Sequence, residues 1–420
     1  MRTNVLAREK AGSDTNWLDA TCRRLIAARL DGLVGGTLTI RDADGSLRLG
    51  SGDPVGEIAV RDPRFYRRVV RGGTLGAAEA YVDGDWDCDE LVGLVGLLVR
   101  NRSLTDRLER GVARLTGALA RTAHVLFADN TQRGSRRNIA AHYDLGNVLF
   151  EHMLDSRMQY SAAMFEFATD DLEVASRRKL DRIVAKLELN ADDHLLEIGS
   201  GWGGLAIHAA RRSGCRVTTT TISREQYDHA RARVAAAGLA DRIEVLCKDY
   251  RQLTGAYSKL VSVEMVEAVG ANHLDRYFTA VGRLLADDGL ALLQAITIED
   301  CRYEHALRSV DFIKKHIFPG SFIPCVSVLL GSAARASDLV AVNLEDLGAD
   351  YARTLAAWRV RFEAAWPQIA ALGYDERFRR SWRFYLSYCE GGFRERSLSD
   401  VQLLLAKPGY RGRPWRVREP

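Results

Sequence analysis

Short apolar runs alternate with helical patterns along the second half of the chain. Runs of about four to eight apolar residues are typical of buried strands, whereas apolar positions three and four apart indicate amphipathic helices. Strands in series with helices predict a doubly wound α/β sheet. The predicted strands are 194–198, 216–221, 242–247, 259–264 and 289–296, followed by late helices at 350–371 and 375–390 and a closing strand within 397–407.

The first part of the chain has a different pattern. A helical period covers 17–30, and alternation around Asp44 and Gly45 is typical of a hairpin. A strand at 57–60 and a helix at 62–71 follow. We therefore predict a small α+β domain over 1–127, a polar linker at 128–137 and a second domain over 138–420.

The stretch from His194 to Gly204 predicts a cofactor cradle, because it reads as strand, glycine turn and helix. Glycine allows positive φ and close approach of a ligand, and a helix N-terminus offers free N–H groups. Two cofactors fit the spacing. A dinucleotide site asks for an acidic residue about 20 positions on, where this chain has Thr221; Glu197, just before the first glycine, favours S-adenosylmethionine instead.

Composition excludes several kinds of partner and site. The net charge of +4 among 420 residues gives no reason to expect nucleic acid as a partner. The seven scattered cysteines lack a C-x-x-C pair, and the histidines share no ligand spacing, so we expect reduced thiols and no metal. No signal peptide or spanning apolar run is recognisable. These features predict a cytoplasmic protein.

Four strings resemble the cyclopropane-fatty-acyl-phospholipid synthase family: NIAAHYDLGN at 138–147, QYSAAMF at 159–165, EIGSGWGGLA at 197–206 and ADYARTLAAWRVRFEAAW at 349–366. The resemblance implies a class I methyltransferase sheet with a final antiparallel strand. It also implies methyl transfer from S-adenosylmethionine to a cis double bond of a phospholipid acyl chain. In that family a bound bicarbonate takes the proton whose loss closes a cyclopropane ring.

The resemblance also implies roles for individual residues. Glu267 and Tyr351 match the positions that hold bicarbonate, with Ala162, Gln294 and Ile296 beside them. Residues expected to line the acyl-chain pocket are Tyr143, Phe318 and Cys389. Residues expected to bind the cofactor are Tyr160, Ser161, Gly199, Gly201, Thr221, Ile222, Gln226, Asp249 and Tyr250.

Three positions depart from the family pattern. Ala162 replaces a cysteine, Ala268 replaces a histidine, and Gln294 replaces a histidine at the end of the fifth strand. An amide can hydrogen-bond an anion but cannot accept a proton near neutral pH. A methylene-branched product without ring closure, or a catalytically weak relative that only binds, therefore stays open beside cyclopropane formation.

A phospholipid substrate implies docking on a membrane surface. Six arginines lie on the polar face of a predicted helix at 100–127, and four more lie in the tail from Tyr410. Such basic faces favour anionic lipid headgroups. We expect peripheral association with the inner face of the membrane, and the family resemblance implies a homodimer.

Overall fold

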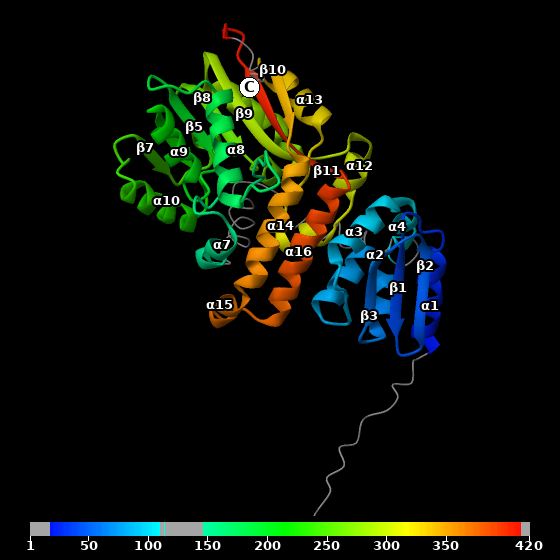
Figure 1. Cartoon of the computed structure of the whole chain (residues 1–420). Helices are drawn as coiled ribbons and strands as arrows, with labels where there is room; N and C mark the ends of the chain where they lie inside the picture. The colour runs from blue at the N-terminus through cyan, green and yellow to red at the C-terminus, as the bar shows by residue number, and fades with distance from the viewer. Residues whose placement is uncertain (1–16, 110–112, 114–145, 413–420) are drawn as a thin grey trace, which may run out of the picture.

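The computed structural model describes residues 17–109, 113 and 146–412, which contain two β-sheets (Figure 1). The predicted basic helix is described only as α4, Arg102–Leu108, and at residue 113; the linker at 128–137 and the tail from 413 lie outside the described residues.

The first sheet has four strands in the order β2-β1-β3-β4. β1 and β2 pair antiparallel through the predicted hairpin, and β3 runs parallel to β1. The elements of this unit are α1 Trp17–Arg29, β1 Gly36–Asp42, β2 Gly45–Ser51, β3 Pro54–Val60, α2 Arg64–Val82, β4 Trp86–Asp87 and α3 Leu91–Arg100, followed by α4. α2 is longer than the predicted helix at 62–71 because it continues past a kink at Gly73.

The second sheet has seven strands in the order β10-β11-β9-β8-β5-β6-β7, and the five predicted strands are its parallel part. β11 is the predicted closing strand and runs antiparallel between β9 and β10. The strands are β5 His194–Ile198, β6 Arg216–Thr220, β7 Ile243–Leu246, β8 Tyr257–Val263, β9 Leu285–Ile298, β10 Val340–Asp346 and β11 Leu398–Ala406. β10 was not predicted, because its residues are exposed or partly buried at the sheet edge and so lack a clear apolar run.

Alternate residues of each central strand point to opposite faces of this sheet. Leu195 packs with α8 and α9 on one face, whereas Leu196 packs with α11 and α13 on the other. Both faces are covered, which explains why the strands are nearly continuous apolar runs. The helices and helical turns of this unit are α7 Asn147–Met153, α8 Leu172–Lys186, α9 Gly204–Ser213, α10 Arg224–Ala236, η1 Tyr250–Gln252, η2 Val266–Ala268, η3 Ala271–His273, α11 Leu274–Leu284, α12 Asp300–Arg308, η4 Ile313–Ile317, α13 Val326–Ala336, α14 Gly348–Ala364, α15 Trp366–Ala371 and α16 Glu376–Arg394.

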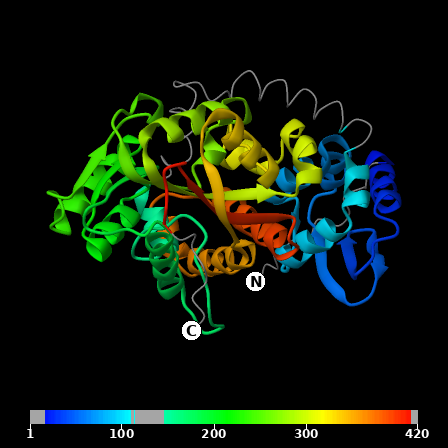
Figure 2. The ribbon, with the colours of Figure 1, turned by 90° about the horizontal axis from the view of Figure 1, so that it is seen from above.

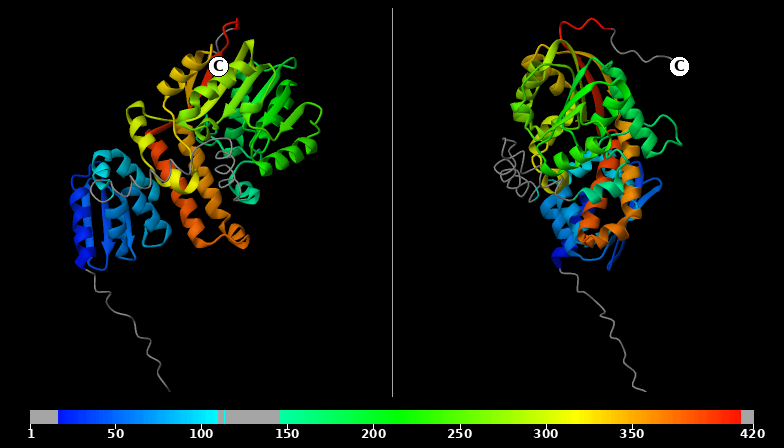
Figure 3. Two further views of the ribbon diagram at one scale, coloured as in Figure 1. Left: turned by 180° about the vertical axis from the view of Figure 1, so that it is seen from behind. Right: turned by 90° about the vertical axis from the view of Figure 1, so that its left-hand side faces the viewer.

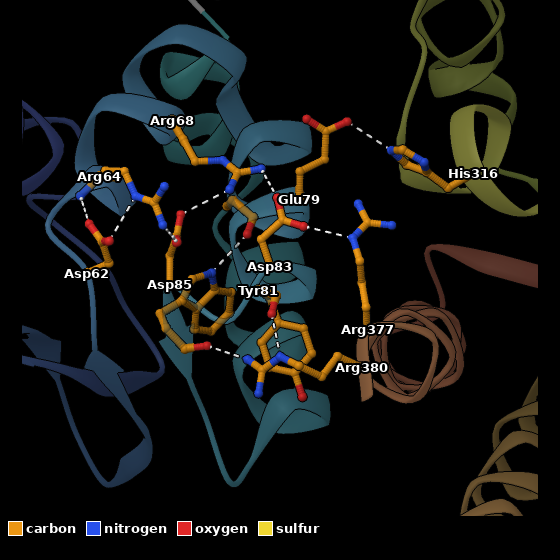
Figure 4. Close-up of polar contacts among 12 residues, drawn as sticks. Asp62, Arg64, Arg68, Glu79, Tyr81, Asp83, Asp85, His316, Arg377 and Arg380 are labelled. Carbon is orange, nitrogen blue, oxygen red and sulfur yellow. Dashed lines mark hydrogen bonds and ion pairs between the residues drawn. The ribbon is translucent and has the colours of Figure 1, made fainter. Parts of the chain in front are cut away.

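The helices α14 and α16 lie between the two sheets (Figures 2 and 3). Arg380 of α16 donates to the carbonyl oxygens of Tyr81 and Trp86 at 2.6 and 2.7 Å, and its guanidinium lies 4.2 Å from the Tyr81 ring centroid (Figure 4). Arg377 donates to Asp83 at 3.0 Å. These contacts join the four-stranded unit to the carboxyl-terminal helices.

Candidate active site

The glycine turn after β5 bends the chain over the end of β6. The N–H groups of Gly199 and Ser200 both donate to the Thr220 carbonyl oxygen at 2.9 Å. Gly201 has a φ of 48°, a conformation that side chains other than glycine rarely adopt. The turn leads into α9 at Gly204, so the helix N-terminus faces the carboxyl end of the sheet, where open α/β sheets bind ligands.

A buried carboxyl group and a buried amine lie beneath this turn. Glu197 accepts a hydrogen bond from the Thr219 hydroxyl at 2.5 Å, and burial raises the pKa of Glu197 to about 8. Lys179 is fully buried and donates to Gln159 Oε1 at 2.9 Å and to the Ser161 hydroxyl at 2.8 Å. The Lys179 contacts fix the segment that carries Tyr160 and Ser161 against the cradle.

The ends of β6 and β7 supply the next polar groups. Thr221 donates from its hydroxyl to Gln226 Oε1 at 2.9 Å, which sets the position of the Gln226 amide. Asp249 accepts from the backbone N–H of Arg251 at 3.0 Å and from its guanidinium at 2.6 Å. Burial raises the pKa of the neighbouring Tyr250 hydroxyl to about 12.

One cavity of about 1270 Å³ connects the cradle with an aromatic wall. Tyr160 bonds through its hydroxyl to the Tyr385 hydroxyl at 2.8 Å, and its ring centroid lies 5.1 Å from that of Trp358. Phe318 lies across from both tyrosines, with centroid distances of 6.4 and 6.1 Å. Aromatic faces attract cations, so this wall suits a positively charged group.

Glu264, directly after β8, is a carboxylate of this cavity that accepts hydrogen bonds from three segments far apart in the sequence. Its Oε1 accepts from the Ala162 backbone N–H at 2.7 Å and from the Gln294 amide at 3.0 Å, and its Oε2 accepts from the Tyr351 hydroxyl at 2.6 Å. Its φ of 46° lies in the left-handed region, which costs a residue other than glycine about 1–3 kcal/mol. Strain of this kind tends to persist at functional sites.

Glu267 is held differently. Its Oε1 accepts from the Ile296 backbone N–H at 2.6 Å, and its buried Oε2 has no protein partner among the described residues. Burial, together with the charge of Glu264, raises the pKa of Glu267 to about 8. The buried Asp400 accepts from the Gln294 amide at 2.8 Å, and burial raises its pKa as well. With three donors, Glu264 is the member of this group best suited to carry the negative charge.

The structure brings most of the residues singled out in the sequence to this one cavity. Ala162 and Gln294 are fully buried behind it and reach it through Glu264. Tyr143 lies outside the described residues. The residues from that set that line the cavity are Tyr160, Ser161, Gly199, Gly201, Thr221, Ile222, Gln226, Asp249, Tyr250, Glu267, Ile296, Phe318, Tyr351 and Cys389.

Sequence reasoning missed Glu264. Its signal was a carboxylate at the carboxyl end of a parallel strand, three residues before Glu267. The partners of its side chain come from positions 30, 87 and 102 residues away along the chain. No local pattern indicates such contacts.

Bicarbonate, which the resemblance implies, does not fit these donors. The Ala162 N–H, the Tyr351 hydroxyl and the Gln294 amide would have to hold the anion, yet all three donate to the Glu264 carboxylate. A second anion at this point would meet that charge at hydrogen-bond distance.

Comparison with known proteins supports the interpretation of the cradle. The chain is 39% identical over 356 residues to a tuberculostearic acid methyltransferase of Mycobacterium tuberculosis, covering 83% of this chain and 82% of the relative. It is 38% identical over 362 residues to the cyclopropane-fatty-acyl-phospholipid synthase of Escherichia coli, covering 85% and 89%. These relatives set aside the dinucleotide alternative.

Solved structures agree with the sequence relatives. Mycolic acid cyclopropane synthase CmaA1, crystallised with SAH and CTAB, superposes with a TM-score of 0.61 at 28% identity and covers 65% of this chain and 98% of its own. The fold is therefore the class I methyltransferase fold. The family described as mycolic acid cyclopropane synthetase matches residues 130–403. This chain belongs to that family of S-adenosylmethionine-dependent methyltransferases.

Proposed function

We propose that this chain transfers the methyl group of S-adenosylmethionine to a cis double bond in an acyl chain of a membrane phospholipid, and closes a cyclopropane ring. The observation that carries the proposal is the single cavity, which joins the glycine cradle, the aromatic wall and the Glu264 carboxylate. The relative from Escherichia coli is named for this reaction.

The cradle residues fit the methyl donor. We assign the turn at Gly199 and Gly201 to the methionine part. The Thr221 hydroxyl donates to the Gln226 amide oxygen and so orients this amide. We assign Gln226, Thr221 and Ile222 to the ribose, Asp249 and Tyr250 to the adenine, and Tyr160 and Ser161 to the remaining contacts. When bound, S-adenosylmethionine supplies an electrophilic methyl group on a sulfonium.

The rest of the cavity suits an acyl chain. Its lining includes Leu94, Leu98 and Phe384 besides Phe318 and Cys389, so apolar contacts extend from the cradle toward the four-stranded unit. A dry apolar pocket keeps water from trapping a carbocation. The faces of Tyr160 and Phe318 stabilise that cation.

Five positions form the proposed catalytic surround. The carboxylate of Glu264 is held by the Tyr351 hydroxyl, the Gln294 amide and the Ala162 backbone N–H. The backbone N–H of Ile296 orients the carboxyl group of Glu267. Positioned groups of this kind contribute to catalysis by fixing charge where it is needed.

Turnover on vesicles tests the proposal. Vesicles of unsaturated phospholipid, S-adenosylmethionine and the purified chain should release S-adenosylhomocysteine and give a lipid that is heavier by one methylene group. NMR of the lipid distinguishes a cyclopropane ring from the alternative methylene branch. If no methylated lipid forms, the proposed activity is refuted and a protein that only binds is the remaining interpretation.

Location and assembly belong to the same proposal. None of the helices in the described part of the chain is long and apolar enough to span a membrane. We propose peripheral binding at the cytoplasmic face of an anionic membrane, through the basic segment after Arg100 and the tail, as a homodimer. The domains proposed are 1–127, with the basic helix, and 138–420, joined by 128–137.

A further inference from the structure

We propose that the carboxylate of Glu264 is a base built into this chain, and that it removes the proton whose loss completes the reaction. It stands in the place that bicarbonate would otherwise fill. This inference rests on the proposed function and deepens it, because it names the group that accepts the proton.

The carboxylate of Glu264 is held by three hydrogen bonds. Donors from three separate elements converge on its two oxygens: the backbone after Gln159, the strand β9 and the helix α14. Each donor has a fixed position, since Ala162, Gln294 and Tyr351 are all buried. Preorganised donors aimed at one anion are what a base needs in order to stay ionised in a dry cavity.

The backbone at Glu264 is strained. A left-handed φ follows β8 at this residue, and its N–H donates to the Gln294 carbonyl oxygen at 2.8 Å. Glycine would take this conformation without strain. The chain instead holds a glutamate there, with its side chain lining the cavity. The three donors compensate for the strain and fix the carboxylate beside the cradle, where Met265 approaches Gly199.

Two other buried carboxyl groups lie near Glu264 but are less suited to carry a negative charge. The carboxyl group of Glu267 accepts from the Ile296 N–H and that of Asp400 from the Gln294 amide, and burial raises the pKa of both. Burial also raises the pKa of Glu264, but its three donors and the charge of Lys179 act in the opposite direction. A sulfonium bound in the cradle would act in the same direction as these donors, because opposite charges stabilise each other.

The chemical step balances without another reactant. Methyl transfer leaves a carbocation on the acyl chain, next to the carbon that now bears the new methyl group. One C–H bond of that methyl breaks, and its electron pair forms the C–C bond that closes the ring. The proton passes to an oxygen of Glu264 and leaves to water after the products depart.

The first measurement uses the unaltered protein. Turnover in buffer freed of carbon dioxide should equal turnover with added bicarbonate, within about twofold. A requirement for bicarbonate would overturn the inference while leaving the proposed function intact. No methylated lipid under either condition would instead refute the proposed function.

Two variants test the carboxylate directly. Glu264→Gln keeps the shape but cannot take the proton, so turnover should fall by about 100-fold or more, with or without bicarbonate. Glu264→Gly frees the three donors, so its turnover should fall similarly and then recover by about tenfold when bicarbonate is added. Binding of S-adenosylhomocysteine to each variant shows that the cradle is still folded.

A matched control uses a second strained glutamate. Glu188 has a φ of 52° after α8 and does not line the cavity, so Glu188→Gly should keep full turnover and show no response to bicarbonate.

Near-normal turnover of Glu264→Gln in buffer without bicarbonate would exclude Glu264 as the base. Should Glu264→Gly fail to fold, the glutamine variant and the unaltered protein still decide.

Discussion

Gln294 links two carboxyl groups through one amide nitrogen. Its Nε2 donates to Glu264 at 3.0 Å and to Asp400 at 2.8 Å, and its Oε1 accepts from Gln402 at 3.1 Å. An amide carries two N–H bonds and no titratable proton. The inability of Gln294 to accept a proton counted against activity in the sequence analysis; in the folded chain this residue acts as a donor, and Glu264 offers the basic group.

Loss of the Tyr351 hydroxyl should change the pH dependence of turnover. This hydroxyl donates to Glu264 at 2.6 Å and lowers the pKa of that carboxyl group. In Tyr351→Phe the pKa of Glu264 rises, a higher pH is needed to ionise it, and the acid limb of the kcat profile moves to higher pH. Removing one such donor should reduce kcat at neutral pH by about 100-fold.

The control for this prediction is Tyr385→Phe. The Tyr385 hydroxyl lines the same cavity but bonds to Tyr160. Its loss should leave the acid limb unmoved, and Kd for S-adenosylhomocysteine should be similar in both variants. An unchanged acid limb in Tyr351→Phe would show that the Tyr351 hydroxyl does not set the pKa of the catalytic base.

At the scale of elements, the start of α9 is packed against the segment that carries Tyr160. A Cβ at Gly204 would lie 2.2 Å from the Arg157 carbonyl oxygen and 2.4 Å from Gln159 Nε2. Such distances require the backbone to move. The cradle and the segment of residues 157–161 are therefore positioned by one close contact at the helix N-terminus.

Gly204→Ala should destabilise the fold and weaken binding of the methyl donor together. Overpacking of a tight contact costs about 1–3 kcal/mol, and displacement of 157–161 moves Tyr160 and Ser161 with it. Thermal unfolding and calorimetric titration with S-adenosylhomocysteine measure the two effects. Gly331→Ala is the control, since its Cβ would meet only Arg335 Nη1 at 3.7 Å within α13; equal behaviour of the two variants would contradict the packing argument.

At the scale of the whole molecule, the two units meet through charged groups beside the cavity. Glu79 of α2 lies 2.8 Å from His316 Nε2 and accepts from Lys315 at 2.6 Å. The bond with His316, aided by Lys315, lowers the pKa of Glu79 from its ordinary value of 4.5 to about 2. Lys315 and His316 belong to η4, after α12, and Lys315 also lines the cavity.

The contribution of Glu79 to stability should depend on pH. A carboxyl group with a lowered pKa stabilises the folded state fully above its unfolded pKa, and this contribution is lost as pH falls toward the folded pKa. The difference in Tm between the unaltered protein and Glu79→Gln should thus be greatest above about pH 4.5 and shrink toward pH 2. Glu304→Gln breaks an exposed pair with Arg308 and should change Tm little at any pH.

Membrane docking should depend on charge. Binding to vesicles should strengthen with anionic lipid and weaken with salt, because surface charges are screened. Replacing Arg416 and Arg418 by alanine should cost about 1 kcal/mol for each arginine, measured by vesicle co-sedimentation. The same change at Arg211 and Arg212, exposed at the end of α9, is the control; equal loss in both pairs, or equal binding to neutral vesicles, would argue against a specific basic surface.

Much of the fold could be predicted from the local pattern of apolar and polar residues. The five parallel strands and the antiparallel β11 follow from apolar runs, because both faces of this sheet are covered by helices. The edge strand β10 was not readable, since burial there is incomplete. The glycine turn was equally plain, because strand, turn and helix are consecutive in the chain.

The sequence by itself therefore determined the class of sheet, the cradle and the residues at the ends of the strands, all of which depend on neighbours a few positions apart. The family resemblance pointed to Glu267, and nothing in the local pattern singled out Glu264, three residues earlier. Only the tertiary structure decided that Glu264 receives the donors from Ala162, Gln294 and Tyr351. Hydrogen bonds between distant segments depend on how the sheet and α14 pack, and that packing leaves no periodic trace along the chain.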